Sequence, residues 1–98
     1  SYVEAAIAAA LREADPTLEV VLEPSVAVGG RTVRPDILVK KGAEAVVIEI
    51  KRALRQGLSR DATVLQVLAY AKALGTPRAI VLFMPEGGGE VTAAGAAT

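Results

Sequence analysis

Two strand-like runs joined by a short polar turn constrain the fold of this chain more than any other feature. The runs cover residues 33–40 and 45–51, with a turn near Lys41-Gly42 between them. Side chains on a strand alternate between its two faces, so each run predicts a strand and the pair predicts an antiparallel hairpin. One face of the second run is wholly apolar and consists of Val46, Ile48 and Ile50. We expect that face to be buried.

The charged residues of the same hairpin are expected to gather at one end of its other face. Asp36 follows Pro35 in the first run, and Glu49 and Lys51 share one face of the second. Antiparallel pairing brings these two carboxylates and one ammonium together. An ordinary hairpin has little use for that arrangement, so the group is a candidate site for chemistry.

Asp36 and Glu49 can share a hard divalent cation, with the backbone carbonyl of Ile50, water and a phosphate oxygen completing an oxygen shell. Two close carboxylates repel each other when ionised, and a cation offsets that repulsion. Lys51 can orient or deprotonate a water and stabilise developing negative charge. In-line attack of such a metal-activated water on a phosphodiester fits these groups. The alternative is a surface Asp, Glu and Lys joined by salt bridges worth about 0–1 kcal/mol.

The absence of two residue types narrows the chemistry further. The chain has 98 residues with no cysteine and no histidine. This composition excludes zinc–thiolate sites, histidine general bases and Ser-His or Cys-His nucleophiles. Any metal must therefore be held by oxygen ligands, which favours Mg²⁺, with Mn²⁺ as a substitute.

The length predicts a single domain, because 98 residues with a hydrophobic fraction of 52% can bury one modest core. We expect that domain to cover residues 1–86. Residues 87–98 lack a core pattern and predict a flexible tail. No apolar run approaches the roughly 20 residues of a membrane-spanning helix, and no signal-peptide pattern is present. We expect a cytoplasmic protein with no membrane partner.

The formal net charge of zero hides a segregation of charge along the chain. Residues 31–60 carry eight Lys or Arg against three acids, whereas residues 1–30 carry one Arg against five acids. The basic block surrounds Asp36 and Glu49, so it predicts contact with a polyanion such as DNA. A solvated charged surface is the alternative. The candidate DNA-binding residues are Arg31, Arg34, Arg52, Arg55 and Arg60.

The remaining segments predict an αβββαβ order. Residues 2–14 have helical spacing and residues 18–28 are strand-like, with a Gly29-Gly30 hairpin turn after them. A basic loop over residues 52–60 precedes a helix over residues 61–74. The continuous apolar run of residues 78–84 predicts a buried strand that follows a helical crossover. The fold class is therefore α/β, with a mixed central sheet flanked by helices.

Three polar residues on the predicted helices are further candidates. Glu4 projects beside Ala8 and Leu11, toward the apolar stripe, where a carboxylate needs a partner or a metal. It can instead reach water from the first turn of its helix. Gln66 and Tyr70, four residues apart, lie one above the other and can look into the active face. Their alternative role is packing at the boundary of the helix.

These motifs together resemble the PD-(D/E)xK nuclease superfamily. The resemblance rests on Pro35-Asp36, on Glu49-Ile50-Lys51 and on Gln66 to Tyr70, which is similar to the QxxxY motif of one branch. The chain is especially similar to the N-terminal nuclease domain of type I restriction motor subunits. RecB-type and Holliday-junction-resolvase-type nucleases are the next most similar. The resemblance implies a restriction-endonuclease-like fold over about residues 2–85.

The same resemblance implies a role for each site residue. Asp36 and Glu49 are then metal ligands, Lys51 the catalytic lysine and Glu4 the acid of the first helix, while Gln66 and Tyr70 assist at the edge of the site. The leading hypothesis is a Mg²⁺-dependent deoxyribonuclease, more specifically an endonuclease. A nuclease-fold module that binds DNA ends or junctions without cutting is the second hypothesis, and a structural or interaction domain is the third. A homodimer and a place within a larger protein are both left open.

Overall fold

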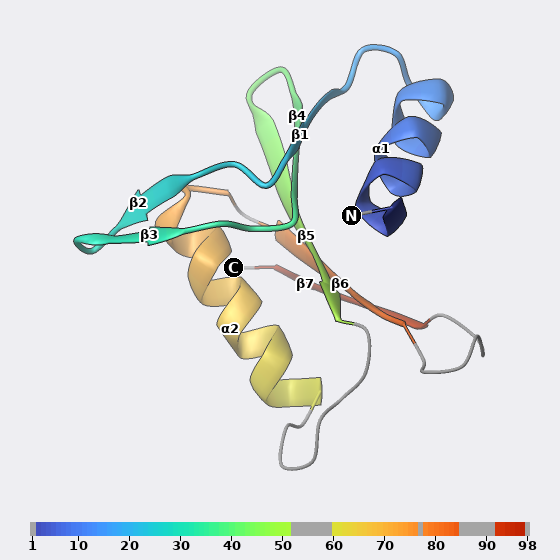
Figure 1. The fold of residues 1–98 in the computed structure, drawn as a ribbon. Coiled ribbons are helices and arrows are strands. Elements are labelled where there is room, and N and C mark those ends of the chain that lie inside the picture. Colours follow the sequence, from blue (N-terminus) through green and yellow to red (C-terminus); the bar gives the residue numbers. More distant parts are fainter. Residues whose placement is uncertain (1, 52–59, 77, 85–91, 98) are drawn as a thin grey trace.

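The computed structural model describes residues 2–51, 60–76, 78–84 and 92–97. A five-stranded mixed sheet forms the centre, and a separate two-stranded sheet projects beside it (Figure 1). The elements in chain order are α1 (Tyr2–Ala14), β1 (Glu19–Leu22), β2 (Val26–Val28), β3 (Arg31–Val33), β4 (Ile37–Lys41), β5 (Glu44–Lys51), α2 (Arg60–Ala73), β6 (Arg78–Phe83) and β7 (Thr92–Ala97).

The central sheet has the strand order β1-β4-β5-β6-β7. Its first three strands pair antiparallel, and β6 then pairs parallel with β5. Helix α2 lies in the crossover between these two parallel strands, as parallel pairing requires. The elements α1, β1, β4, β5, α2 and β6 therefore form the predicted αβββαβ core.

The two helices cover opposite faces of the sheet (Figure 1). On the α1 side, Ala8 packs with Ile37 and Ile48, which are almost completely buried. On the α2 side, Val67 packs with Val47, and both are buried. The β4–β5 hairpin is therefore covered on both faces, and its end beyond Ile37 and Ile48 borders an open cleft.

The run predicted as one strand over residues 33–40 is instead divided between two sheets. Strand β3 ends at Val33 and β4 begins at Ile37. Pro35 lies between them, and a proline has no backbone N–H to donate to a strand ladder and restricts the residue before it. As a result, Asp36 precedes β4 and does not lie within a strand.

The segment over residues 18–28 is divided in the same way. Strand β1 belongs to the central sheet, whereas β2 pairs with β3 in the small sheet. Between them, Glu23 has a positive φ of 46° and is followed by Pro24. The predicted turn at Gly29-Gly30 is present. Both glycines have positive φ, 55° and 77°, which a two-residue hairpin turn of this kind requires.

A flexible tail was predicted over residues 87–98, and the structure corrects this prediction over residues 92–97, whereas residues 87–91 and 98 lie outside the described residues. Residues 92–97 form β7, which pairs antiparallel with β6 from Phe83↔Thr92 to Arg78↔Ala97. Alanine and glycine give this segment little strand propensity of its own, so the exposed edge of β6 supplies the template that orders it. Within the described residues, no helix is long and apolar enough to cross a bilayer.

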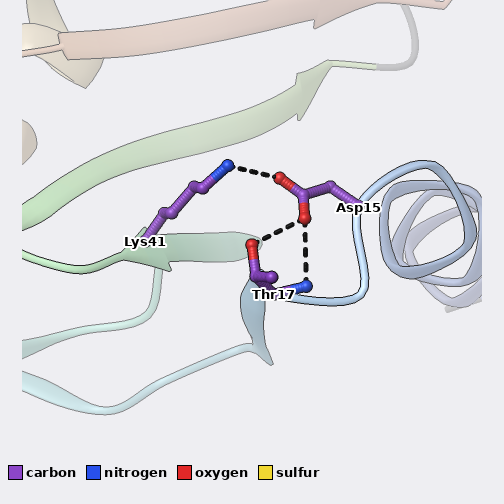
Figure 2. Close-up of polar contacts among 3 residues, drawn as sticks. All are labelled: Asp15, Thr17 and Lys41. Atoms are coloured by element: carbon purple, nitrogen blue, oxygen red, sulfur yellow. Dashed lines mark hydrogen bonds and ion pairs between the residues drawn. The ribbon is translucent and has the colours of Figure 1, made fainter.

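The end of α1 is tied to β4 by one exposed polar cluster (Figure 2). Asp15 accepts hydrogen bonds from the Thr17 N–H (3.0 Å) and hydroxyl (2.6 Å) and from Lys41 Nζ (2.7 Å). The bond from Lys41, followed by those from Thr17, lowers the pKa of Asp15 to about 2. Because Lys41 is the last residue of β4, this cluster fixes the turn end of the β4–β5 hairpin relative to α1.

Candidate functional site

Asp36 and Glu49 hold each other in place at the opposite end of that hairpin. The ladder ends at Ile37↔Ile48, so these two acids occupy the next opposed positions. The Asp36 N–H donates to Glu49 Oε1 at 2.7 Å, and the Ile50 N–H donates to Asp36 Oδ2 at 2.7 Å. Each carboxylate thus uses one oxygen to accept a backbone N–H and keeps a second oxygen for other partners.

Glu4 joins these acids from the first turn of α1. Its side chain is only 7% exposed, so it faces the sheet and not the solvent. A hydrogen bond between the Glu4 and Asp36 side chains contributes to a raised pKa of Asp36. Of the two directions that the sequence left open for Glu4, toward the apolar stripe or toward water, the structure has the inward one.

Burial dominates the electrostatics of the two central acids. It raises the pKa of Glu49 to about 7, against the opposing effect of the Asp36 N–H, and the charges of Asp36 and Glu4 raise it further. Burial also raises the pKa of Asp36, against the hydrogen bond from the Ile50 N–H. Ionising these two acids is therefore costly in this poorly solvated place, and a cation would offset that cost.

An open cleft of about 560 Å³ leads to this site. Its floor is Glu49 and Lys51 on β5, with Lys51 Nζ 4.0 Å from Glu49 Oε2. One wall is α2, and the other is the β3 side of the β2–β3 hairpin. Asp36 and Glu4 are not among the residues that line this cleft, and they support Glu49 from behind.

Gln66 and Tyr70 lie on the α2 wall of the cleft. Gln66 Nε2 donates a hydrogen bond to the Tyr70 hydroxyl at 3.3 Å. The predicted arrangement of one side chain above the other is therefore present, and both residues face the site rather than the core. The hydrogen bond orients the phenol at the edge of the floor.

The predicted basic residues have different outcomes. Arg31 and Arg34 line the cleft on the hairpin side. Arg60 is the first residue of α2, and Arg52 and Arg55 lie outside the described residues. The sequence did not identify the hairpin as a wall of the site. Two sequence features could have indicated this wall: the Gly29-Gly30 turn and the proline at position 35, which together separate β2 and β3 from the central sheet.

The donor set fits a hard divalent cation by its chemistry. Asp36 and Glu49 each keep an oxygen that accepts no backbone N–H, and all of the candidate ligands are oxygens. The raised pKa of each acid also reflects a charge that a cation would balance. Within the described residues, however, no group of three or more acidic side chains is arranged to hold a metal. Two carboxylates and the Ile50 carbonyl are thus the candidate protein ligands.

No family profile matches the chain, and no curated protein matches it. Among solved structures, it is similar to the crystal structure of SSO0001, with a TM-score of 0.62 and 16% sequence identity over 98% of this chain and 49% of that chain. It is also similar to Hjc, a Holliday junction resolvase from the archaeal hyperthermophile Archaeoglobus fulgidus. That match has a TM-score of 0.56 and 22% identity over 93% of this chain and 72% of that chain.

These likenesses show the fold. The protein has a restriction-endonuclease-like α/β fold, with a mixed central sheet flanked by helices, as found in Hjc. The fold class predicted from the sequence is confirmed. The chain spans about half the length of SSO0001.

Proposed function

We propose that this protein is a divalent-metal-dependent nuclease that hydrolyses phosphodiester bonds of DNA. One observation carries the proposal: Asp36 and Glu49 are hydrogen-bonded to each other's strand at the end of the β4–β5 hairpin, and Glu49 lies beside Lys51 in a cleft with a cationic wall. Structural likeness to the resolvase Hjc supports it, because the same fold there belongs to a DNA-processing enzyme.

Each residue has a proposed role that follows from its position. Asp36, Glu49 and the Ile50 carbonyl hold Mg²⁺ or, as a substitute, Mn²⁺. A bound divalent ion supplies Lewis acidity for the attack of water on phosphorus and for departure of the leaving oxygen. Lys51, beside Glu49 at the cleft floor, orients the attacking water and stabilises charge that develops on the phosphate oxygens.

Three further residues support that core. Glu4 fixes Asp36 through their shared hydrogen bond, so its role is to position a ligand. Gln66 and Tyr70 contact the substrate at the edge of the cleft, where their mutual hydrogen bond holds them together. Together with the fold, they support a place in the QxxxY-containing branch of the PD-(D/E)xK nucleases, near the type I restriction nuclease domain.

The assembly in which the chain works is also a proposal. The chain is small and covers about half of SSO0001, so we propose that it acts as a pair of copies or within a larger cytoplasmic protein. DNA is the proposed partner in either case, and endonucleolytic cutting is the proposed mode.

The test is cleavage of plasmid, linear and branched DNA in Mg²⁺ or Mn²⁺, with EDTA as the blank. We expect cutting that stops in EDTA and is strongly reduced in the Asp36→Asn and Lys51→Ala variants. Cutting by these variants at the parent rate would assign the activity to a contaminant or to other residues. If none of these substrates is cut in either metal, the nuclease proposal is excluded.

A second function is favoured by the occupied carboxylate oxygens. Asp36 and Glu49 each accept a backbone N–H, and within the described residues no third acid completes a metal-binding group. These features suit a nuclease-fold module that binds DNA ends or junctions without cutting. It predicts salt-dependent DNA binding that needs no metal and survives Glu49→Ala, in the absence of any cleavage.

A further inference from the structure

The cleft above Glu49 has two walls of different chemistry. The hairpin wall carries Arg31 and Arg34, which are exposed cations. The described lining residues of α2 are uncharged and include Gln66 and Tyr70 with its aromatic ring. A nucleic-acid strand placed between them meets cations on one side and a ring on the other.

We infer that the cleft takes a single nucleic-acid strand, with its phosphates along the β2–β3 hairpin and its bases or sugars toward α2. This inference rests on the proposed function and names its substrate class, which is unpaired or splayed DNA. A single strand presents phosphates on one edge and base faces on the other, matching the two walls. Single-strand binding proteins combine a cationic groove with aromatic side chains in the same way.

A continuous duplex fits the cleft poorly. Both of its phosphate chains face outward and its bases are paired inside, so an aromatic wall has no base face to contact. Glu49 is only 7% exposed at the cleft floor, so a phosphodiester must descend between the walls to reach it.

The spacing of the hairpin arginines also suits one strand. Arg31 is the first residue of β3 and Arg34 directly follows its last residue, so their Cα atoms are at most about 10 Å apart at roughly 3.3 Å per residue. Both side chains line the same cleft, so they follow a single backbone path. Arg34 is followed by buried Pro35 and then Asp36, so the wall leads directly to the acids.

The charge balance of the cleft agrees with this path. Its described lining contains three cations, Arg31, Arg34 and Lys51, against the single acid Glu49. The competing geometry is insertion of the β-ribbon into a duplex groove. The tip that would enter the groove is Gly29-Gly30, which offers no side chain for reading a base edge.

The test measures binding of the parent protein in EDTA, which suppresses cutting. The probes are one fluorescent oligonucleotide as a single strand, as a blunt duplex and as a duplex with an unpaired flap. We expect the single strand and the flap to bind at least about tenfold more tightly than the duplex. Equal or tighter binding of the blunt duplex would overturn the inference.

The variants compare two pairs of exposed cations. Arg31→Ala with Arg34→Ala should weaken single-strand binding about tenfold and reduce the slope of log K against log salt by roughly 1.4, at about 0.7 per phosphate contact. The matched control is Lys40→Ala with Arg78→Ala, which removes the same charge from exposed residues outside this cleft. If both double variants lose the same affinity for the single strand, the hairpin arginines act only as nonspecific charge, which would contradict the inference.

Cleavage assays separate this inference from the proposed function. Metal-dependent cutting of blunt duplex as fast as single strands would keep the nuclease and refute the strand-sized cleft. If single strands bind tightly, depend on the hairpin arginines and are never cut, the inference about the cleft is supported and the proposed nuclease function is refuted. Melting temperatures of both double variants within error of the parent confirm that the comparison reports binding and not unfolding.

Discussion

Two acidic clusters lie at opposite ends of the β4–β5 hairpin, and their pKa values move in opposite directions. At the turn end, exposed Asp15 bonds to Lys41 and its pKa falls to about 2. At the other end, buried Glu49 faces Asp36 and its pKa rises to about 7. The first cluster is stabilised in its ionised form by a cation of the protein, whereas burial of the second favours the neutral forms of its acids.

This difference separates a structural role from the proposed functional one. A paired surface carboxylate fixes one element against another and has modest energetic weight. Buried carboxylates that repel each other oppose folding, and such arrangements concentrate at functional sites. Substitutions at the two ends should therefore change different properties of the molecule.

The largest expected effect is on cleavage. Glu49→Gln should reduce the rate of DNA hydrolysis by about 10³-fold or more, since it removes a proposed metal ligand from the reacting groups. Its amide oxygen can still accept the Asp36 N–H, so the fold should persist. Plasmid nicking in Mg²⁺ measures the rate, and isothermal titration with Mn²⁺ measures the accompanying loss of metal affinity.

The matched control for that variant lies on the same strand. Glu44→Gln changes the same chemistry at the exposed first residue of β5, near the turn end. It should cut DNA at the parent rate. A similar loss in both variants would mean that net charge, and not the position of Glu49, sets the activity.

The second prediction separates Lys51 from the acids beside it. Lys51→Ala should lower cleavage by about 10²-fold, a typical contribution of one positioned charged or proton-transferring group. It should leave Mn²⁺ affinity within a few fold of the parent, because an ammonium cannot coordinate a cation. Loss of metal binding in this variant would contradict its assignment as a group that acts on water and phosphate.

Much of the fold could be predicted because its signals are local. Helix α1 has the predicted bounds, and α2 begins and ends one residue before its prediction. The valine-rich run over residues 45–51 predicted β5, and the glycine turn fixed its register with β4. Strand β7 could not be predicted, since alanine and glycine become a strand only when β6 provides the pairing edge.

The site was predictable in part for the same reason. Hairpin register alone places Asp36 opposite Glu49, and helical spacing turns Glu4 inward. The mutual backbone hydrogen bonds depend on Asp36 standing just outside β4, after Pro35 has ended the ladder. The cationic wall depends on β2 and β3 pairing with each other outside the central sheet. Which strands pair is decided by contacts between distant parts of the chain and not by local sequence.

The third prediction concerns stability at the buried end. The folded-state pKa of Glu49 is raised from 4.5 to about 7, so the stability associated with its protonation is complete below 4.5 and is lost as pH rises through 7. Glu49→Gln should therefore unfold with a free energy about 1 kcal/mol higher than the parent at about pH 8 in EDTA. Urea titration measures this gain, which should vanish near pH 4. If Glu49→Gln instead lowers the free energy of unfolding at pH 8, the ionised Glu49 carboxylate must be stabilised by its partners in the folded protein.

The smallest effect is expected at the exposed end. The folded-state pKa of Asp15 is lowered from 3.8 to about 2, so its contribution to stability is present above pH 3.8 and disappears as pH falls toward 2. Asp15→Asn keeps an acceptor for Thr17 but removes the charge that pairs with Lys41. It should lower the melting temperature slightly at neutral pH, less so at high salt, and leave DNA cleavage unchanged.

The control is Asp15→Ala, which also removes the acceptor for Thr17. If Asp15→Asn melts at as low a temperature as Asp15→Ala, the ion pair with Lys41 provides the stabilisation, whereas if it melts with the parent, the bonds to Thr17 provide it. Either result keeps Asp15 structural, but slower cleavage would show that the two ends of the hairpin are coupled.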